Sequence, residues 1–208
     1  MGFRDRLLFF YLFSVAVISF AIALTITAIV TPHWLSARLY PVDDTGQSVK
    51  ITYGLVQKCS TITNECTPFP MEECTTGDRE FCNIWRTTSF MMWLSLVLLG
   101  PAVISYATLI LSNRQTRETG WRLIGLLLFL IVIVQVVAVS AVVNLLRTDA
   151  NLQNGNWHIG ISWVAATGSV VVVLGLLIST IVIGCKTVPE YVPIREAVRS
   201  SLATDSVA

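Results

Sequence analysis

The chain has 208 residues, of which 54% are hydrophobic and 13% are charged, and its formal net charge is +1. A soluble domain usually carries about 25% charged residues, so this composition excludes an ordinary water-soluble fold. The small net charge also argues against a nucleic-acid partner, because such binding depends on clustered basic side chains.

Four long segments contain no Asp, Glu, Lys or Arg, and they cover residues 7–30, 87–111, 123–146 and 159–184. Each forms a helix of about 36 Å or more, against about 30 Å for the hydrocarbon core of a bilayer. Backbone groups in that core have no water to bond, so only helices or closed barrels can cross it. The runs lack the alternation of apolar and polar residues that is typical of barrel strands. We therefore predict four transmembrane helices, and the lipid bilayer is the first partner that we expect.

The first segment has one alternative interpretation. Arg4 and Arg6 before an apolar run are also typical of a cleaved signal peptide. The run continues to Val30, however, which is further than a signal peptide needs. We therefore expect this segment to remain as a membrane span.

The predicted organisation follows from these segments. We expect spans at residues 7–30, 88–111, 122–146 and 159–185. The other segments are an N-terminus at 1–6, a first outer loop at 31–87, an inner loop at 112–121, a second outer loop at 147–158 and a flexible tail at 186–208.

The orientation is predicted from Lys and Arg near the ends of the spans, because cytoplasmic loops carry an excess of both. One side has three such residues, and the other has six: Arg4, Arg6, Arg114, Arg117, Arg122 and Lys186. We therefore expect both termini in the cytoplasm of a multi-pass plasma-membrane protein.

The cysteines predict the same topology independently. Cys59, Cys66, Cys74 and Cys82 all lie in the first outer loop, where an oxidising compartment allows disulfides to persist. Four cysteines allow three pairings, and the sequence does not choose among them. Cys185 lies at the cytoplasmic end of the last span, where it is a candidate for S-palmitoylation or an unmodified thiol.

The first outer loop contains local structural signals. Pro32 discourages further helix, and Trp34 is placed to bury its ring while its N–H stays in contact with water at the interface. Alternating apolar residues from Val49 to Leu55 predict a half-buried strand that runs into Cys59. The two prolines between Cys66 and Cys74 predict a loop.

Catalytic chemistry is not expected. The two histidines, His33 and His158, could bind a metal, but no carboxylate or thiol lies at ligand spacing from either. We interpret both as interfacial residues and expect no catalytic residue, metal or cofactor. Gln135 and Asn144, inside the third span, could line a polar path. We expect them instead to bond neighbouring helices, because conducting paths usually contain ionisable groups.

Residues of the first loop carry a resemblance to a known family. Pro32-His33-Trp34 follows the first span, the segment "GLVQKC" runs from Gly54 and Leu55 to Cys59, and Arg86 stands before the second span. In these residues and in its topology the chain resembles the claudin-like tetraspan superfamily.

Two departures accompany this resemblance. Val56 stands where the family has a second tryptophan, and the first loop has four cysteines where claudins normally have two. Cys66 lies nearer to Cys59, and Cys74 farther, than the family's usual partner, so the partner of Cys59 stays open. The differences indicate a divergent branch, for which the claudin-like tetraspans of fungal plasma membranes are one candidate.

The resemblance implies an all-α transmembrane fold, with a left-handed four-helix bundle capped by a small disulfide-braced antiparallel sheet. Trp34 and the Gly54-Leu55 turn would hold the sheet at the bilayer surface, with Cys59 fixing the strand. It also implies action through association with itself or with other membrane proteins.

We therefore expect a non-enzymatic protein that organises membrane or cell-surface contacts through its extracellular domain. The alternative is an auxiliary subunit of an ion channel or transporter. A channel in its own right is disfavoured by the uncharged spans.

Overall fold

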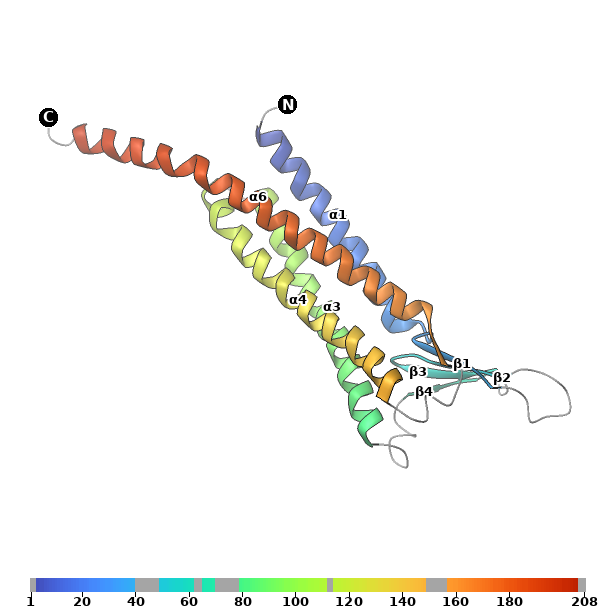
Figure 1. The fold of residues 1–208 in the computed structure, drawn as a ribbon. Coiled ribbons are helices and arrows are strands. Elements are labelled where there is room, and N and C mark those ends of the chain that lie inside the picture. The colour runs from blue at the N-terminus through green and yellow to red at the C-terminus, as the bar shows by residue number, and fades with distance from the viewer. Residues whose placement is uncertain are drawn as a thin grey trace, which may run out of the picture.

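Four long helices dominate the structure, a computed structural model that describes residues 3–39, 49–61, 65–69, 79–111, 114–148 and 157–205 (Figure 1). Side chains are described for most of these residues, but not beyond Cys185. The helices are α1 (Phe3–Val30), α3 (Arg79–Leu111), α4 (Arg114–Thr148) and α6 (Ile161–Asp205).

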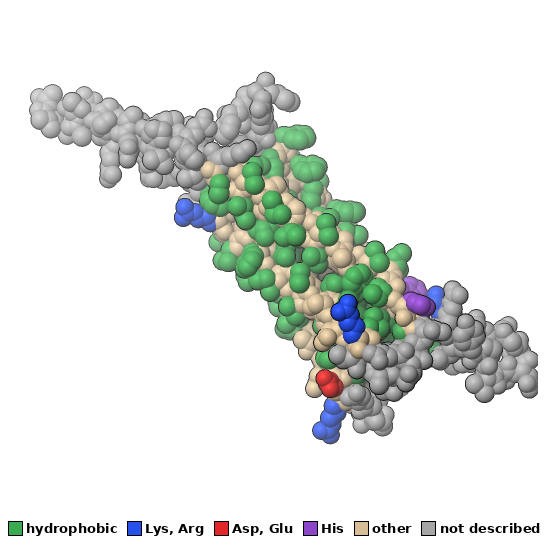
Figure 2. Space-filling view, viewed as in Figure 1, with side chains coloured by type: hydrophobic (Ala, Val, Ile, Leu, Met, Phe, Trp, Pro, Cys, Tyr) green, Lys and Arg blue, Asp and Glu red, His purple; other side chains and the backbone are tan. Residues whose placement is uncertain are grey.

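All four helices contain a stretch that is long and apolar enough to cross a membrane. These stretches are Leu8–Val30, Arg79–Leu111, Gly120–Arg147 and Ile161–Cys185. Figure 2 shows hydrophobic side chains along the middle of the visible face and charged side chains toward its two ends. An apolar outer surface of this kind is stable against lipid rather than water. The four apolar helices indicate a multi-pass membrane protein.

The helices form one bundle in which each packs against two others, α1 against α3 and α6, and α4 against the same two. Buried residues recur every three or four positions, as α3 illustrates with Met92, Ser95, Leu99 and Ala102. This spacing follows from 3.6 residues per turn, which places such residues on one helix face. The opposite faces expose large apolar side chains such as Phe90 and Val97.

A five-stranded antiparallel sheet covers one end of the bundle, which we call the sheet end (Figure 1). Its strand order is β4-β3-β2-β1-β5. The strands are β1 (Leu35–Leu39), β2 (Val49–Tyr53), β3 (Gln57–Ser60), β4 (Glu65–Pro68) and β5 (Trp157–Ile159). Strand β5 pairs with β1, so the segment before α6 joins the segment after α1. Helix α1 begins and α6 ends at the opposite end, which we call the tail end.

The structure corrects two local predictions for the first loop. The predicted strand does not continue into Cys59, because β2 ends at Tyr53 and the chain reverses, so that Cys59 lies on β3. The predicted loop after Cys66 begins instead with β4, which continues to Pro68. Pro68 is tolerated there because β4 is an edge strand, where a missing N–H donor costs no ladder bond on the open side.

All four helices extend beyond the apolar spans that predicted them. Helix α4, for example, begins at Arg114, inside the predicted inner loop of residues 112–121. Helix α3 begins at Arg79, inside the predicted outer loop, because polar side chains mark where a membrane span ends and need not end the helix itself. Helix α6 continues to Asp205, since adding residues to an existing helix is much easier than nucleating one. Residues 186–205 of the predicted tail are therefore helical, and their flexibility stays a prediction.

Candidate functional site at the sheet end

Trp34 closes the end of α1. Its side chain is fully buried, and its indole N–H donates a hydrogen bond of 2.6 Å to the backbone oxygen of Ala28. The last four carbonyls of a helix have no hydrogen-bond donor within the helix, and the indole of Trp34 supplies a donor to one of them, that of Ala28. The predicted contact of this N–H with water is therefore wrong, because the helix end competes successfully for the same donor.

The turn between β2 and β3 packs directly against Pro32, in the segment between α1 and β1. Gly54 donates its N–H to the backbone oxygen of Gln57 at 2.9 Å, which closes the turn. A Cβ at Gly54 would lie 2.6 Å from the Cα of Pro32, so only glycine fits this approach. Leu55 is buried beside it, whereas Val56 is 47% exposed. The turn therefore presents its second residue to the core and its third to the surroundings.

Trp85 on α3 contacts this turn from the side of the helices. Its buried indole N–H donates to the backbone oxygen of Gly54 at 3.1 Å. Its ring stacks on Phe81 with 5.5 Å between centroids and meets Phe69 edge-on at 5.7 Å. Sequence reasoning missed Trp85 and Phe69. The aromatic pair Phe81 and Trp85, four residues apart and thus on one helix face, was the available signal for the first.

Aromatic rings extend from this point under the sheet. Tyr53 lies 5.0 Å from Phe69 and 5.1 Å from Trp157, between ring centroids. The ammonium of Lys58 lies 5.0 Å above the Tyr53 ring, a distance at which cation–π attraction acts. Rings from β2, β5, the segment after β4 and α3 therefore form a continuous layer between the sheet and the helices.

The start of α6 is fastened to the end of α1. The hydroxyls of Thr31 and Ser162 are 2.6 Å apart, and the N–H of Ser162 donates to the backbone oxygen of His33 at 3.2 Å. Gly160 donates its N–H to the backbone oxygen of Trp34 at 2.9 Å. The segment that follows α1 and the segment that precedes α6 thus meet at one junction, which sets the position of the sheet on the bundle.

The two faces of the sheet differ. Directly paired residues of antiparallel strands share a face, so Leu35, Tyr53 and Lys58 lie on one face and Ser36, Thr52 and Cys59 lie on the other. Leu35 belongs to the core cluster with Trp34, Leu55 and Trp85, so its face is turned toward the helices. The second face, which we call the outward face, is polar apart from its cysteines and Pro68.

One disulfide lies on the outward face. Cys59 and Cys66 are directly opposed on β3 and β4 and are bonded to each other. Cys82, near the start of α3, is also disulfide-bonded, while Cys74 lies outside the described residues. Cys185, the remaining cysteine, is a free and exposed thiol. The structure therefore chooses Cys66 for Cys59, which the sequence left open.

Arg86 and the two histidines are not part of a shared site. Arg86 is exposed on α3, immediately after the buried Trp85. His158 is exposed on β5 opposite Ser36, whereas His33 is half-buried at the junction. Within the described part of the chain, no group of three or more His, Cys, Asp or Glu residues could hold a metal ion.

A polar cluster connects the four helices inside the bundle. The amide nitrogen of Gln135 lies 3.2 Å from the hydroxyl of Ser169, 3.3 Å from that of Thr25 and 3.5 Å from that of Ser95. Each of the four residues comes from a different helix, and all are fully buried. Gln135 therefore bonds neighbouring helices as predicted, while Asn144 lies on the exposed face of α4.

The sheet end can act as a rigid surface. Its inner face is held by two indole hydrogen bonds, the junction of α1 with α6, and a layer of stacked rings. At its edge, all residues of strand β4 are exposed, and so are Lys50 and His158 on the outward face. No protein-family model matches the chain, and no curated protein matches it either.

Proposed function

We propose that this chain is a non-enzymatic, claudin-like tetraspan of the plasma membrane that organises membrane or cell-surface contacts through its sheet end. Attachment of the sheet at Trp34 and Trp85 is the observation that carries the proposal. A small sheet gains stability by packing an apolar face or by packing against helices, and this sheet packs on the bundle. Such a construction suits a preformed recognition surface, which loses little entropy on binding.

The proposal requires the sheet end to face the outside of the cell and both termini to face the cytoplasm. A membrane-impermeant maleimide applied to unreduced cells tests this, because Cys185 is a free, exposed thiol at the tail end and the disulfide-bonded cysteines do not react. Labelling should appear only after the membrane is permeabilised, and Cys185→Ser should abolish it. Labelling of intact cells that depends on Cys185 would contradict the proposed orientation.

The partner is identified by purification in mild detergent followed by mass spectrometry. We expect the chain itself, or adhesion and cell-surface proteins, to be recovered in complex. Paired variants locate the contact: Lys50→Glu with His158→Glu changes two exposed residues of the outward face, and Val171→Leu changes an exposed residue of the α6 span. The first should lose the partner while still reaching the cell surface, and the second should keep it.

A different recovery would favour the alternative function. A large channel or transporter at fixed stoichiometry would identify an auxiliary subunit and would remove the contact-organising proposal. Retention of the same partners by the outward-face variant would show that the contact lies elsewhere on the molecule.

A further inference from the structure

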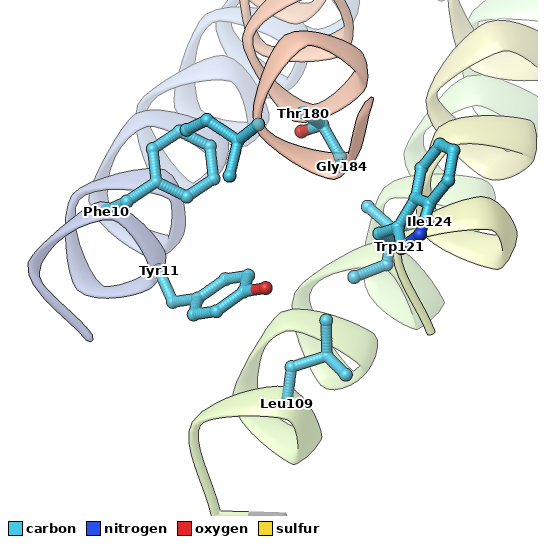
Figure 3. Close-up of a pocket in the computed structure, with 8 residues that line it drawn as sticks. Phe10, Tyr11, Leu109, Trp121, Ile124, Thr180 and Gly184 are labelled. Atoms are coloured by element: carbon cyan, nitrogen blue, oxygen red, sulfur yellow. The ribbon is translucent and has the colours of Figure 1, made fainter. Parts of the chain in front are cut away.

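A small pocket lies between the helices at the tail end (Figure 3). All four helices contribute to it, with Phe10 and Tyr11 from α1, Leu109 from α3, Trp121 and Ile124 from α4, and Thr180, Ile183 and Gly184 from α6. The volume open to the centre of a water-sized molecule is about 20 Å³. One water molecule needs about 10–15 Å³ by the same measure.

The indole nitrogen of Trp121 is an unsatisfied donor in this pocket. It is buried, and it has no hydrogen-bond acceptor among the residues that the structure describes. The ring cannot easily move to find one. A Cβ at Gly184 would lie 2.5 Å from the ring carbon Cδ2, which shows how closely the ring packs on α6. The guanidinium of Arg122 lies 5.6 Å above the ring. Buried donors in native proteins are almost always satisfied by protein or water.

Thr180, which lines the same pocket, has an acceptor position to spare. Its hydroxyl donates to the backbone oxygen of Leu176 at 2.8 Å, so the 2.7 Å contact with Tyr106 must be a bond donated by the tyrosine. A hydroxyl has one proton and two lone pairs, which leaves one lone pair of Thr180 for a further donor. The hydroxyl of Tyr11 points toward the same space in Figure 3.

We propose that the pocket binds one water molecule, which accepts the N–H of Trp121 and donates to the hydroxyl of Thr180. The water connects α4 to α6 where these apolar helices approach the tail end.

Nuclear magnetic resonance of the full chain in detergent micelles, with ¹⁵N-labelled tryptophan, tests the proposal. Trp121→Phe assigns the indole signal of Trp121 by its disappearance. Magnetisation transfer from water should reach the Trp121 N–H. It should not reach Trp34 or Trp85, whose indoles bond the backbone oxygens of Ala28 and Gly54. The proposal would be overturned if the Trp121 N–H received as little magnetisation from water as that of Trp34, or if it received magnetisation from detergent chains instead.

Two hydroxyl deletions on α6 test the role of Thr180. Thr180→Val keeps the shape of the side chain and should weaken the water transfer to Trp121 about two-fold or more, because a buried water needs several polar partners. Ser179→Ala removes a hydroxyl that bonds only oxygens of its own helix, at Gly175 and Leu176, and should leave the transfer unchanged. Unchanged Trp34 and Trp85 signals verify the fold of each variant. Equal transfer in both variants would exclude Thr180 as the water's acceptor.

Discussion

Glycine is required at positions 160 and 54 because another segment of the chain passes close to the backbone of each residue. A Cβ at Gly160 would lie 1.8 Å from the backbone oxygen of His33, and one at Gly54 would lie 2.6 Å from the Cα of Pro32. In both cases the obstacle is backbone, which cannot rotate away as a side-chain tip can. Gly175 differs from these two, because a Cβ there would meet nothing within 4 Å.

Gly160→Ala should therefore destabilise the fold, and Gly175→Ala should not. We expect the first to lower the free energy of unfolding by about 1–3 kcal/mol, the usual cost of forcing an extra group into a packed site. The second should raise it by up to about 1 kcal/mol, since alanine is the better helix former. Denaturant titration in micelles measures both. Equal stability of the two variants would contradict the close approach at Gly160.

Strand β4 depends on three attachments: its pairing with β3, the disulfide from Cys66 to Cys59, and the buried Phe69 just beyond its end. All four of its residues are exposed, so the strand itself contributes little apolar burial. The disulfide closes a loop with a sequence separation of 7 residues. It is therefore a main reason why this edge of the sheet is ordered.

Replacing both cysteines, as Cys59→Ser with Cys66→Ser, should destabilise the sheet end by about 2–3 kcal/mol, from the loop-closure entropy of so short a loop. We expect the four apolar helices to determine membrane insertion, and this bond does not involve them. We expect less protein at the cell surface, with an unchanged protease-protection pattern and an unchanged helical circular dichroism signal. Normal delivery to the surface, together with unchanged thermal unfolding, would show that the disulfide is dispensable.

The cluster around Gln135 is the place where all four helices meet through polar groups. Its amide nitrogen makes only long contacts, of 3.2 to 3.5 Å, and its side-chain oxygen has no partner among the described residues. Polar contacts between membrane helices average about 0.6 kcal/mol, whereas an unpaired buried acceptor costs about 1–3 kcal/mol. The cluster therefore contributes to the specificity of helix pairing more than to stability.

Two substitutions at Gln135 separate these contributions. Gln135→Leu keeps most of the volume and removes the unpaired oxygen, so it should leave the free energy of unfolding unchanged or raise it by up to about 1 kcal/mol. Gln135→Ala leaves a cavity between the helices and should lower it by about 2 kcal/mol or more. Denaturant titration in micelles measures both values. A loss on Gln135→Leu as large as that on Gln135→Ala would show that the hydrogen bonds themselves hold the bundle together.

The four spans could be predicted from the sequence because a membrane helix needs an uninterrupted apolar run, and that property is local. The strand β2 and the burial of Trp34 were visible for the same reason, in a period of two and in a tryptophan just after a span. The sequence did not show that β2 ends before Gly54. The alternation of apolar residues continues to Leu55, and the apolar Val56 gives no signal of a turn.

Contacts between different helices and strands could be decided only by the tertiary structure. The partner of Cys59, the bond from Trp85 to Gly54 and the contact between Thr25 and Ser169 join positions 7, 31 and 144 residues apart. Each depends on the relative placement of two elements, which packing determines and which composition does not encode. The start of α3 at Arg79 belongs with them, since its first turns lie beyond the apolar run. Trp85 in these turns is buried in one cluster with Leu35 of the sheet, a contact between distant parts of the chain.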